Sequence, residues 1–97
     1  MYASITTVQF SPEKLDEMFS AVRDMFPMVG PRAAGLQDVF VVADRATGKS
    51  MTISLWDTEA NRNANEGLWK EAMSKVAGFA MGQPVRQGYD IVERFEV

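Results

Sequence analysis

Residues 36–56, LQDVFVVADRATGKSMTISLW, consist of two apolar runs separated by a short polar stretch. The runs at 36–43 and 49–56 are rich in β-branched and aromatic residues, which are typical of strands. Between them, DRATG at 44–48 predicts a tight turn in which Gly48 takes a positive φ angle. The stretch therefore predicts a β-hairpin in the middle of the chain.

The segment before the hairpin predicts a strand and then a helix. Residues 2–10 (YASITTVQF) alternate in part between polar and apolar types, as a strand does. Ser11 is the expected N-cap of the helix, and Pro12 suits its first position. Pro27, with Gly30 and Pro31 after it, predicts the end of this helix. Its apolar stripe follows helical spacing: Leu15, Met18, Phe19, Val22, Met25 and Phe26.

The segment after the hairpin predicts a helix and a long last strand. Asp57 or Thr58 is the expected N-cap of a helix that reaches about residue 78, and residues 85–97 (VRQGYDIVERFEV) predict the strand. The resulting order is βαββαβ, an α+β ferredoxin-like plait with a four-stranded antiparallel sheet and two helices on one face. With 97 residues, we expect a single domain over 1–97.

The strands also indicate that the second face of the sheet is covered. Residues 39–43 (VFVVA) are apolar at both odd and even positions, as in a strand buried on both sides. The last strand likewise carries Tyr89 and Ile91 on one face and Val92 on the other. A homodimer that pairs two sheets by twofold symmetry is the simplest interpretation. The alternative is an enclosed ligand pocket within a monomer.

The composition excludes several kinds of site. The chain has no cysteine and no histidine, so it has no thiol nucleophile, no Ser-His-Asp triad and no imidazole for haem or zinc. No acidic cluster has the spacing of a calcium loop. We therefore expect no metal and no haem.

Charge and hydropathy exclude two kinds of partner. The net charge is −3 and the ten lysines and arginines are scattered, so no nucleic acid partner is expected. No apolar run approaches the ~20 residues of a membrane span, and no leader-like segment is seen at the N-terminus. The expectation is a cytoplasmic protein without membrane attachment.

Three short motifs give the chain a family resemblance. They are a strand that ends in Leu55-Trp56, a helix that opens with residues 57–60 (DTEA) and a terminal strand that ends in residues 95–97 (FEV). Together they resemble the antibiotic biosynthesis monooxygenase-like domain family. The resemblance covers nearly the whole chain. It implies a dimeric α+β barrel.

The resemblance also implies several possible activities. Some members of the family are cofactor-free oxygenases of anthrone-like or quinol aromatics, whereas others degrade haem by means of a histidine ligand that this chain lacks. The implied function is thus a cofactor-independent monooxygenase that acts on an aromatic, quinol-like molecule. The alternatives are a non-catalytic homodimeric module that binds a hydrophobic metabolite, and another reaction on the same scaffold.

The candidate site residues lie mainly on the second helix. Asn61, Asn65 and Trp69 follow one another at i, i+4, so they share one face of a helix. The resemblance implies Asn65, Trp69 and Arg86 as catalytic residues: Asn65 would hold an oxyanion or oxygen adduct, Trp69 would stack on the ring, and Arg86 would stabilise a phenolate. Asn61 and Tyr89 are candidates for substrate binding, although a tyrosine pKa near ~10 makes Tyr89 a weak base.

Each candidate also has a structural explanation. Trp69 continues an apolar stripe with Met73 and Val76, so core packing accounts for it as well. Asn61 is suited to capping the first turn of the helix. Arg86 is close enough in sequence to Asp90 or Glu93 to form a surface ion pair.

Overall fold

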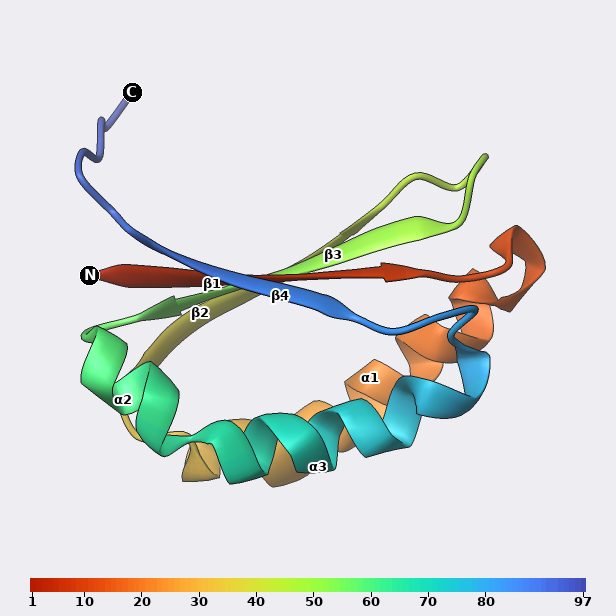
Figure 1. The fold of residues 1–97 in the computed structure, drawn as a ribbon, viewed down its shortest axis with the longest axis horizontal. Coiled ribbons are helices and arrows are strands. Elements are labelled where there is room, and N and C mark those ends of the chain that lie inside the picture. Colours follow the sequence, from red (N-terminus) through yellow and green to blue (C-terminus); the bar gives the residue numbers. More distant parts are fainter.

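The computed structural model describes all 97 residues and shows one antiparallel sheet with helices on one side (Figure 1). The spatial order of the strands is β2-β3-β1-β4, and every neighbouring pair is antiparallel. This arrangement confirms the ferredoxin-like fold class. The strands are β1 (Tyr2–Gln9), β2 (Leu36–Ala43), β3 (Lys49–Trp56) and β4 (Val85–Asp90), and the helices are α1 (Leu15–Val29), α2 (Glu59–Ala64) and α3 (Glu66–Val76).

The central hairpin is confirmed, and its turn depends on Gly48. This residue has φ 82°, a conformation that is strained for residues with a side chain. A Cβ atom at this position would also run into the backbone oxygen of Phe10. The carboxylate of Asp44 accepts a hydrogen bond from the backbone N–H of Ala46 at 2.9 Å, which closes the turn.

Helix α1 ends later than predicted. Pro27 lies inside the helix, which continues to Val29 before a single 3-10 turn at Gly30–Arg32. A proline inside a helix removes its own N–H donor and its ring crowds the carbonyl of residue i−4, but its fixed φ is compatible with a helix. The chain therefore loses one hydrogen bond at Pro27 instead of ending the helix there.

The predicted second helix is in fact two helices. Helix α2 ends at Ala64 and α3 begins at Glu66, with Asn65 between them at φ −102° and ψ 22°. Thr58, one of the two expected candidates, is the N-cap of α2. Its Oγ1 accepts a hydrogen bond from the backbone N–H of Asn61 at 3.1 Å. Asparagine favours such breaks because its side-chain amide competes with the backbone for hydrogen bonds.

The last strand is shorter than predicted. Strand β4 ends at Asp90, and residues 91–97 are outside the sheet. The last backbone bond at this edge runs from the N–H of Ile91 to the oxygen of Met1 at 3.0 Å. This bond is the last one between β4 and β1, and residues 91–97 continue past the ladder. In Figure 1 the C-terminal segment rises away from the sheet on the side opposite the helices.

The packed core occupies one end of the layer between helices and sheet. Its fully buried members come from β1, the following segment, α1 and α3, and they are Val8, Phe10, Leu15, Met18 and Val76. An isolated bridge between Phe10 and Ala80 closes this end of the sheet. Only 11 of the 97 residues are fully buried, so the core is thin even for a domain of this size. No helix is both long and apolar enough to cross a membrane.

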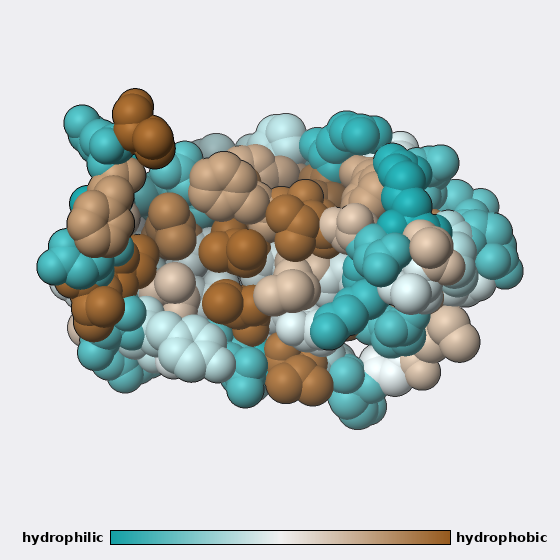
Figure 2. Space-filling view, turned by 90° about the horizontal axis from the view of Figure 1, so that it is seen from above, coloured by the Kyte–Doolittle hydropathy of each residue, from teal (hydrophilic) through white to brown (hydrophobic).

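The face of the sheet away from the helices is apolar. Figure 2 shows hydrophobic residues across the middle of this face. The pairing of Ile5 with Ile53, and of Ile53 with Phe40, places these three side chains in a row on it. Phe40 is 52% exposed, and Val42, Val85 and Tyr89 are exposed as well.

Candidate functional site

A cavity of about 150 Å³ lies between the helices and the sheet. The sheet contributes hydroxyl and apolar side chains, α1 and α3 contribute apolar side chains, and Asn65 contributes an amide. The sheet side consists of Thr6, Leu36, Val39, Val41, Thr52, Ser54 and Trp56, while the helices contribute Val22, Met25, Phe26, Val29, Leu68, Trp69, Ala72, Met73 and Val76. The cavity is thus mostly apolar with a few polar groups, which is typical of a small-molecule site.

Both tryptophans of the chain line this cavity, and both indole N–H groups have partners. Trp69 Nε1 donates to Thr6 Oγ1 at 3.3 Å, and Trp56 Nε1 donates to Ser54 Oγ at 3.0 Å. Because the hydroxyl groups belong to the central strands of the sheet, these bonds fix the orientation of the rings. The cavity therefore has two oriented aromatic side chains.

Asn65 also lines the cavity, at the break between α2 and α3. Its Nδ2 donates to the backbone oxygen of Asn61 at 2.7 Å and to that of Ala34 at 3.2 Å. Both amide hydrogens are thus used, and Oδ1 is left as a free acceptor. In this orientation Asn65 offers an acceptor to a ligand hydroxyl, and its expected role in holding an oxyanion or oxygen adduct stays a prediction.

Arg86 contacts Trp69 but does not line the cavity. Its guanidinium carbon lies 4.3 Å from the centre of the Trp69 ring, which is a cation–π distance. The side chain is only 13% exposed and forms an ion pair with Glu66, whereas the expected surface pairing with Asp90 is not formed. Asn65 and Trp69 therefore share the cavity, and Arg86 contacts it through the indole.

Arg62, which the sequence did not single out, completes a charged cluster next to Trp69. Its Nη1 lies 3.9 Å from the same Glu66 carboxylate, and its Nε donates to Ser4 Oγ at 3.2 Å. Burial, and then the positive charge of Arg62, lower the pKa of Arg86 to about 10. The guanidinium still remains protonated at neutral pH. Its Nε is buried without a hydrogen-bond partner.

Asn61 is outside the cavity. Its Nδ2 donates to Asp57 Oδ1 at 2.8 Å, next to the Gly35 turn. Gly35 has φ 90°, and a Cβ atom there would lie 2.5 Å from Asp57 Oδ1 and 2.7 Å from Asn61 Nδ2. The observed role of Asn61 is to support this turn, and substrate binding by it stays a prediction.

Tyr89 lies on the other side of the sheet. It pairs with Ala3 in the register of β1 and β4. The neighbouring residue, Gly88, faces the helices, and the Tyr2 ring covers it on that side. Successive side chains of a strand point to opposite faces. Tyr89 therefore belongs to the exposed apolar face, and the structure separates it from Asn65 and Trp69.

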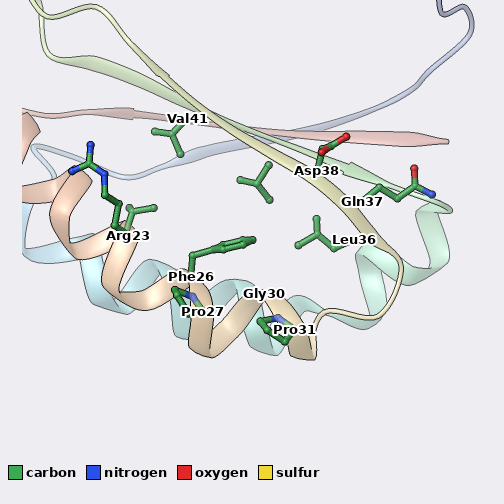
Figure 3. A pocket seen from close by; sticks show the side chains of 11 residues that line it. Arg23, Phe26, Pro27, Gly30, Pro31, Leu36, Gln37, Asp38 and Val41 are labelled. Carbon is green, nitrogen blue, oxygen red and sulfur yellow. The ribbon is translucent and has the colours of Figure 1, made fainter.

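An open groove of about 700 Å³ continues from the cavity to the surface between α1 and β2 (Figure 3). It shares six lining residues with the cavity: Val22, Phe26, Gly30, Leu36, Val39 and Val41. Arg23 lies at one end of the groove, and Gln37 and Asp38 lie at the other. The groove is thus the mouth of the cavity.

The hydroxyl groups of the cavity were not predicted from the sequence. Thr6 pairs with Thr52 and Ser4 with Ser54, all on the helix-facing side of the two central strands. Such positions are normally apolar in a sheet covered by helices. The alternation of Ser4 and Thr6, and of Ser50, Thr52 and Ser54, was the signal for a polar floor under the helices.

The cavity offers shape and hydrogen bonds but no acid or base. None of its lining residues is Asp, Glu, Lys, Arg or Tyr. No group of three or more acidic side chains forms a potential metal site in the structure. The arrangement suits a flat aromatic molecule that stacks on an indole and donates a hydroxyl hydrogen to Asn65 Oδ1.

Solved structures with the same fold include several proteins named for one activity. A "putative antibiotic biosynthesis monooxygenase" from Caulobacter crescentus has a TM-score of 0.78 at 19% identity, and covers 95% of this chain and 90% of its own. One of the same name from Nitrosomonas europaea has a TM-score of 0.77 at 14% identity, and covers 96% of this chain and 100% of its own. The implied family resemblance is confirmed at the level of the fold.

The same fold is also found in a protein without an assigned activity. A Nitrosomonas europaea protein of unknown function has a TM-score of 0.74 at 12% identity, and covers 99% of this chain and 93% of its own. No family model matches the chain. No curated protein matches it either. At such identities the likeness establishes the monooxygenase-like fold, and the activity has to be argued from the site.

Proposed function

We propose that this protein is a cofactor-independent monooxygenase that acts on a small aromatic, quinol-like molecule. The observation that carries the proposal is the apolar cavity with two oriented indoles and the free acceptor of Asn65. The shared fold with proteins named as antibiotic biosynthesis monooxygenases supports it. In this proposal Asn65 and Trp69 contact the substrate, and Arg86 acts through the Trp69 ring.

The reaction needs little from the protein. The substrate loses a proton from an activated C–H to bulk water before it enters the cavity, and the bound carbanion gives one electron to O₂. The resulting radicals combine to a peroxide, which takes up a proton. Loss of water from this hydroperoxide breaks the O–O bond and the second C–H bond, and leaves a C=O group. Carbon is oxidised, and the two atoms of O₂ end in the ketone and in water.

The chain contributes binding, orientation and charge. Trp69 stacks on the flat ring, and Asn65 Oδ1 accepts the hydrogen bond of its hydroxyl. The guanidinium of Arg86, 4.3 Å from the indole centre, favours negative charge on the stacked substrate. The apolar walls exclude water around the reactive carbanion.

We further propose that each protomer is one domain of residues 1–97 and that two protomers pair through the apolar sheet face. That face exposes Phe40, Val42, Val85 and Tyr89, and an exposed apolar patch of this kind is typical of an interface. The C-terminal segment supports the same pairing. It rises on that side of the sheet and carries Val92 and Phe95, which are almost fully exposed and which a second copy would cover.

Oxygen consumption tests the proposed activity. We expect the protein to consume O₂ with anthrones or hydroquinones in the absence of added metal or flavin. Asn65→Ala should lower kcat/KM by about 10-fold or more, since the hydroxyl of the substrate loses its partner. Asn63→Ala is the matched control, because Asn63 is exposed and does not line the cavity. Equal activity of the two variants would contradict the site.

The dependence of the rate on pH provides a second criterion. Because the cavity has no titratable side chain, the rate should rise with pH through the pKa of the substrate itself. Two substrates of different pKa should therefore give two displaced profiles. A profile that is the same for both substrates would indicate a base supplied by the protein.

The same absence of an acid or base favours a second candidate function. A non-catalytic module that binds a hydrophobic metabolite needs only the apolar cavity and its mouth. In that case calorimetry with the same aromatics should show binding that Asn65→Ala weakens, whereas no O₂ is consumed.

A further inference from the structure

The glycine at the C-terminal end of α1 is not required by the backbone. Gly30 has φ −53° and ψ −48°, which is right-handed helical and open to any residue. Glycine is a poor choice here, since it loses more entropy on folding than alanine does. The reason for a glycine must therefore be the space around it.

That space is occupied by the ring of Phe26. A Cβ atom on residue 30 would lie 2.7 Å from Phe26 Cζ, 2.9 Å from Cε1 and 3.1 Å from Cε2. Such distances are shorter than a van der Waals contact, so the ring lies directly against the Gly30 backbone. Figure 3 shows the ring extending from α1 toward β2, above Gly30.

Phe26 lies where the groove meets the cavity. It is one of the six residues that line both spaces, and it is the largest of them. It is also 41% exposed, so it is not part of the packed core. A partly exposed aromatic side chain can change its rotamer much more readily than a buried one.

We propose that Phe26, resting on Gly30, is the gate of the cavity and sets the size of the molecules that pass through the mouth. A flat molecule reaches Trp69 only after the Phe26 side chain changes its rotamer. In the closed position the Phe26 ring occupies the space that Gly30 leaves free. The proposal relies on the cavity of the proposed function as a ligand site, but it does not depend on oxygen chemistry.

The two tryptophans provide a measurement of access. Trp56 and Trp69 are the tryptophans of the chain and both line the cavity, so their fluorescence reports on molecules that enter it. The experiment compares collisional quenching by two neutral molecules of different size, acrylamide and succinimide. The variants are Phe26→Ala, Gly30→Ala and the double variant. Met28→Ala is the control, because Met28 is 60% exposed on the same helix and does not line the cavity.

Phe26→Ala should raise the quenching constant by a factor of about two or more, with the larger effect for succinimide, because packed side chains exclude molecules of that size. Gly30→Ala keeps every other side chain and should change the constant by displacing the ring. The same change should have no effect in the Phe26→Ala background. Thermal unfolding of each variant confirms that it is folded.

Two results would overturn the proposal. One is a Phe26→Ala protein with the same quenching constants as Met28→Ala. The other is an effect of Gly30→Ala that persists when the ring is absent, since the effect would then come from the helix and not from the ring. A chain that shows the gate but no O₂ consumption would retain this inference and lose the oxygenase.

Discussion

Glu66 places one carboxylate between two arginine side chains. It pairs with the largely buried Arg86 and lies 3.9 Å from Arg62. Removing the charge of Glu66 leaves two guanidinium groups that repel each other, one of them 13% exposed. A buried charge without its partner is costly, although the 42% exposure of Glu66 reduces the effect through solvent screening.

We expect Glu66→Gln to lower the free energy of unfolding by about 1–2 kcal/mol. Urea unfolding followed by circular dichroism measures this change in the free energy of unfolding. The control is Glu17→Gln: Glu17 pairs with Lys14 at 3.6 Å on the surface, and its loss should cost at most about 0.5 kcal/mol. Equal effects of the two substitutions would show that the Glu66 cluster is an ordinary surface pair.

At the scale of elements, two glycines differ in what a side chain in their place would meet. Gly48 ends the hairpin turn with φ 82° and lies against the backbone of Phe10. Gly67 lies in the first turn of α3, where no atom outside its own helix is within 4 Å of a Cβ position. A side chain is strained at the first position and free at the second.

Gly48→Ala should therefore lower the free energy of unfolding by about 1–3 kcal/mol, because it combines backbone strain with a clash. Gly67→Ala should instead raise it by about 0.5–1 kcal/mol through helix propensity. Chemical denaturation of each variant and of the parent protein measures both changes in the free energy of unfolding. A destabilising Gly67→Ala would mean that this position is in contact with something else, such as a second protomer.

The whole molecule has more apolar surface than one copy can bury. Only 11 of its 97 residues are fully buried, yet the outer face of the sheet carries a continuous apolar patch (Figure 2). Burial of such a patch contributes about 25 cal/mol per Å². Pairing of two sheets would therefore supply stability that the thin core does not.

We expect the protein to be a dimer by light scattering, with an unfolding temperature that rises with concentration. Phe40→Glu should weaken the dimer by ~2 kcal/mol or more and yield monomers at micromolar concentration. Met28→Glu changes an exposed apolar position on α1 and should leave the dimer intact. A monomeric parent protein would contradict the shared sheet interface.

The sequence predicted the elements well where local signals agreed. The hairpin at 36–56 was confirmed to its turn glycine, and α1 and α3 turn apolar residues of the expected stripes toward the sheet. The errors arose at residues whose type is compatible both with continuing a helix and with ending it. Pro27 did not end α1, and Asn65 interrupted a helix that its apolar stripe predicted to be continuous.

The site was predicted in part, for the same reason. The i, i+4 spacing of Asn65 and Trp69 identified two cavity residues, because helical periodicity is a local property. The separation of Tyr89 from them depends on the register of β4 against β1. A shift of one residue in that register would have turned Tyr89 toward the helices.

By itself, the sequence of this protein determined the fold class and the absence of thiol and imidazole chemistry, since both follow from residue types and short-range periodicity. The tertiary structure alone decided which side chains meet. It placed Arg62 and Arg86 around Glu66, directed the Asn65 donors to backbone oxygens, and put Phe26 over Gly30 at the mouth of the cavity. The contacts of Arg86 with Glu66 and of Asn65 with Ala34 join residues far apart in the sequence, and the place of Phe26 at the mouth depends on how α1 packs against β2. Such geometry depends on strand register and helix packing, which no local pattern encodes.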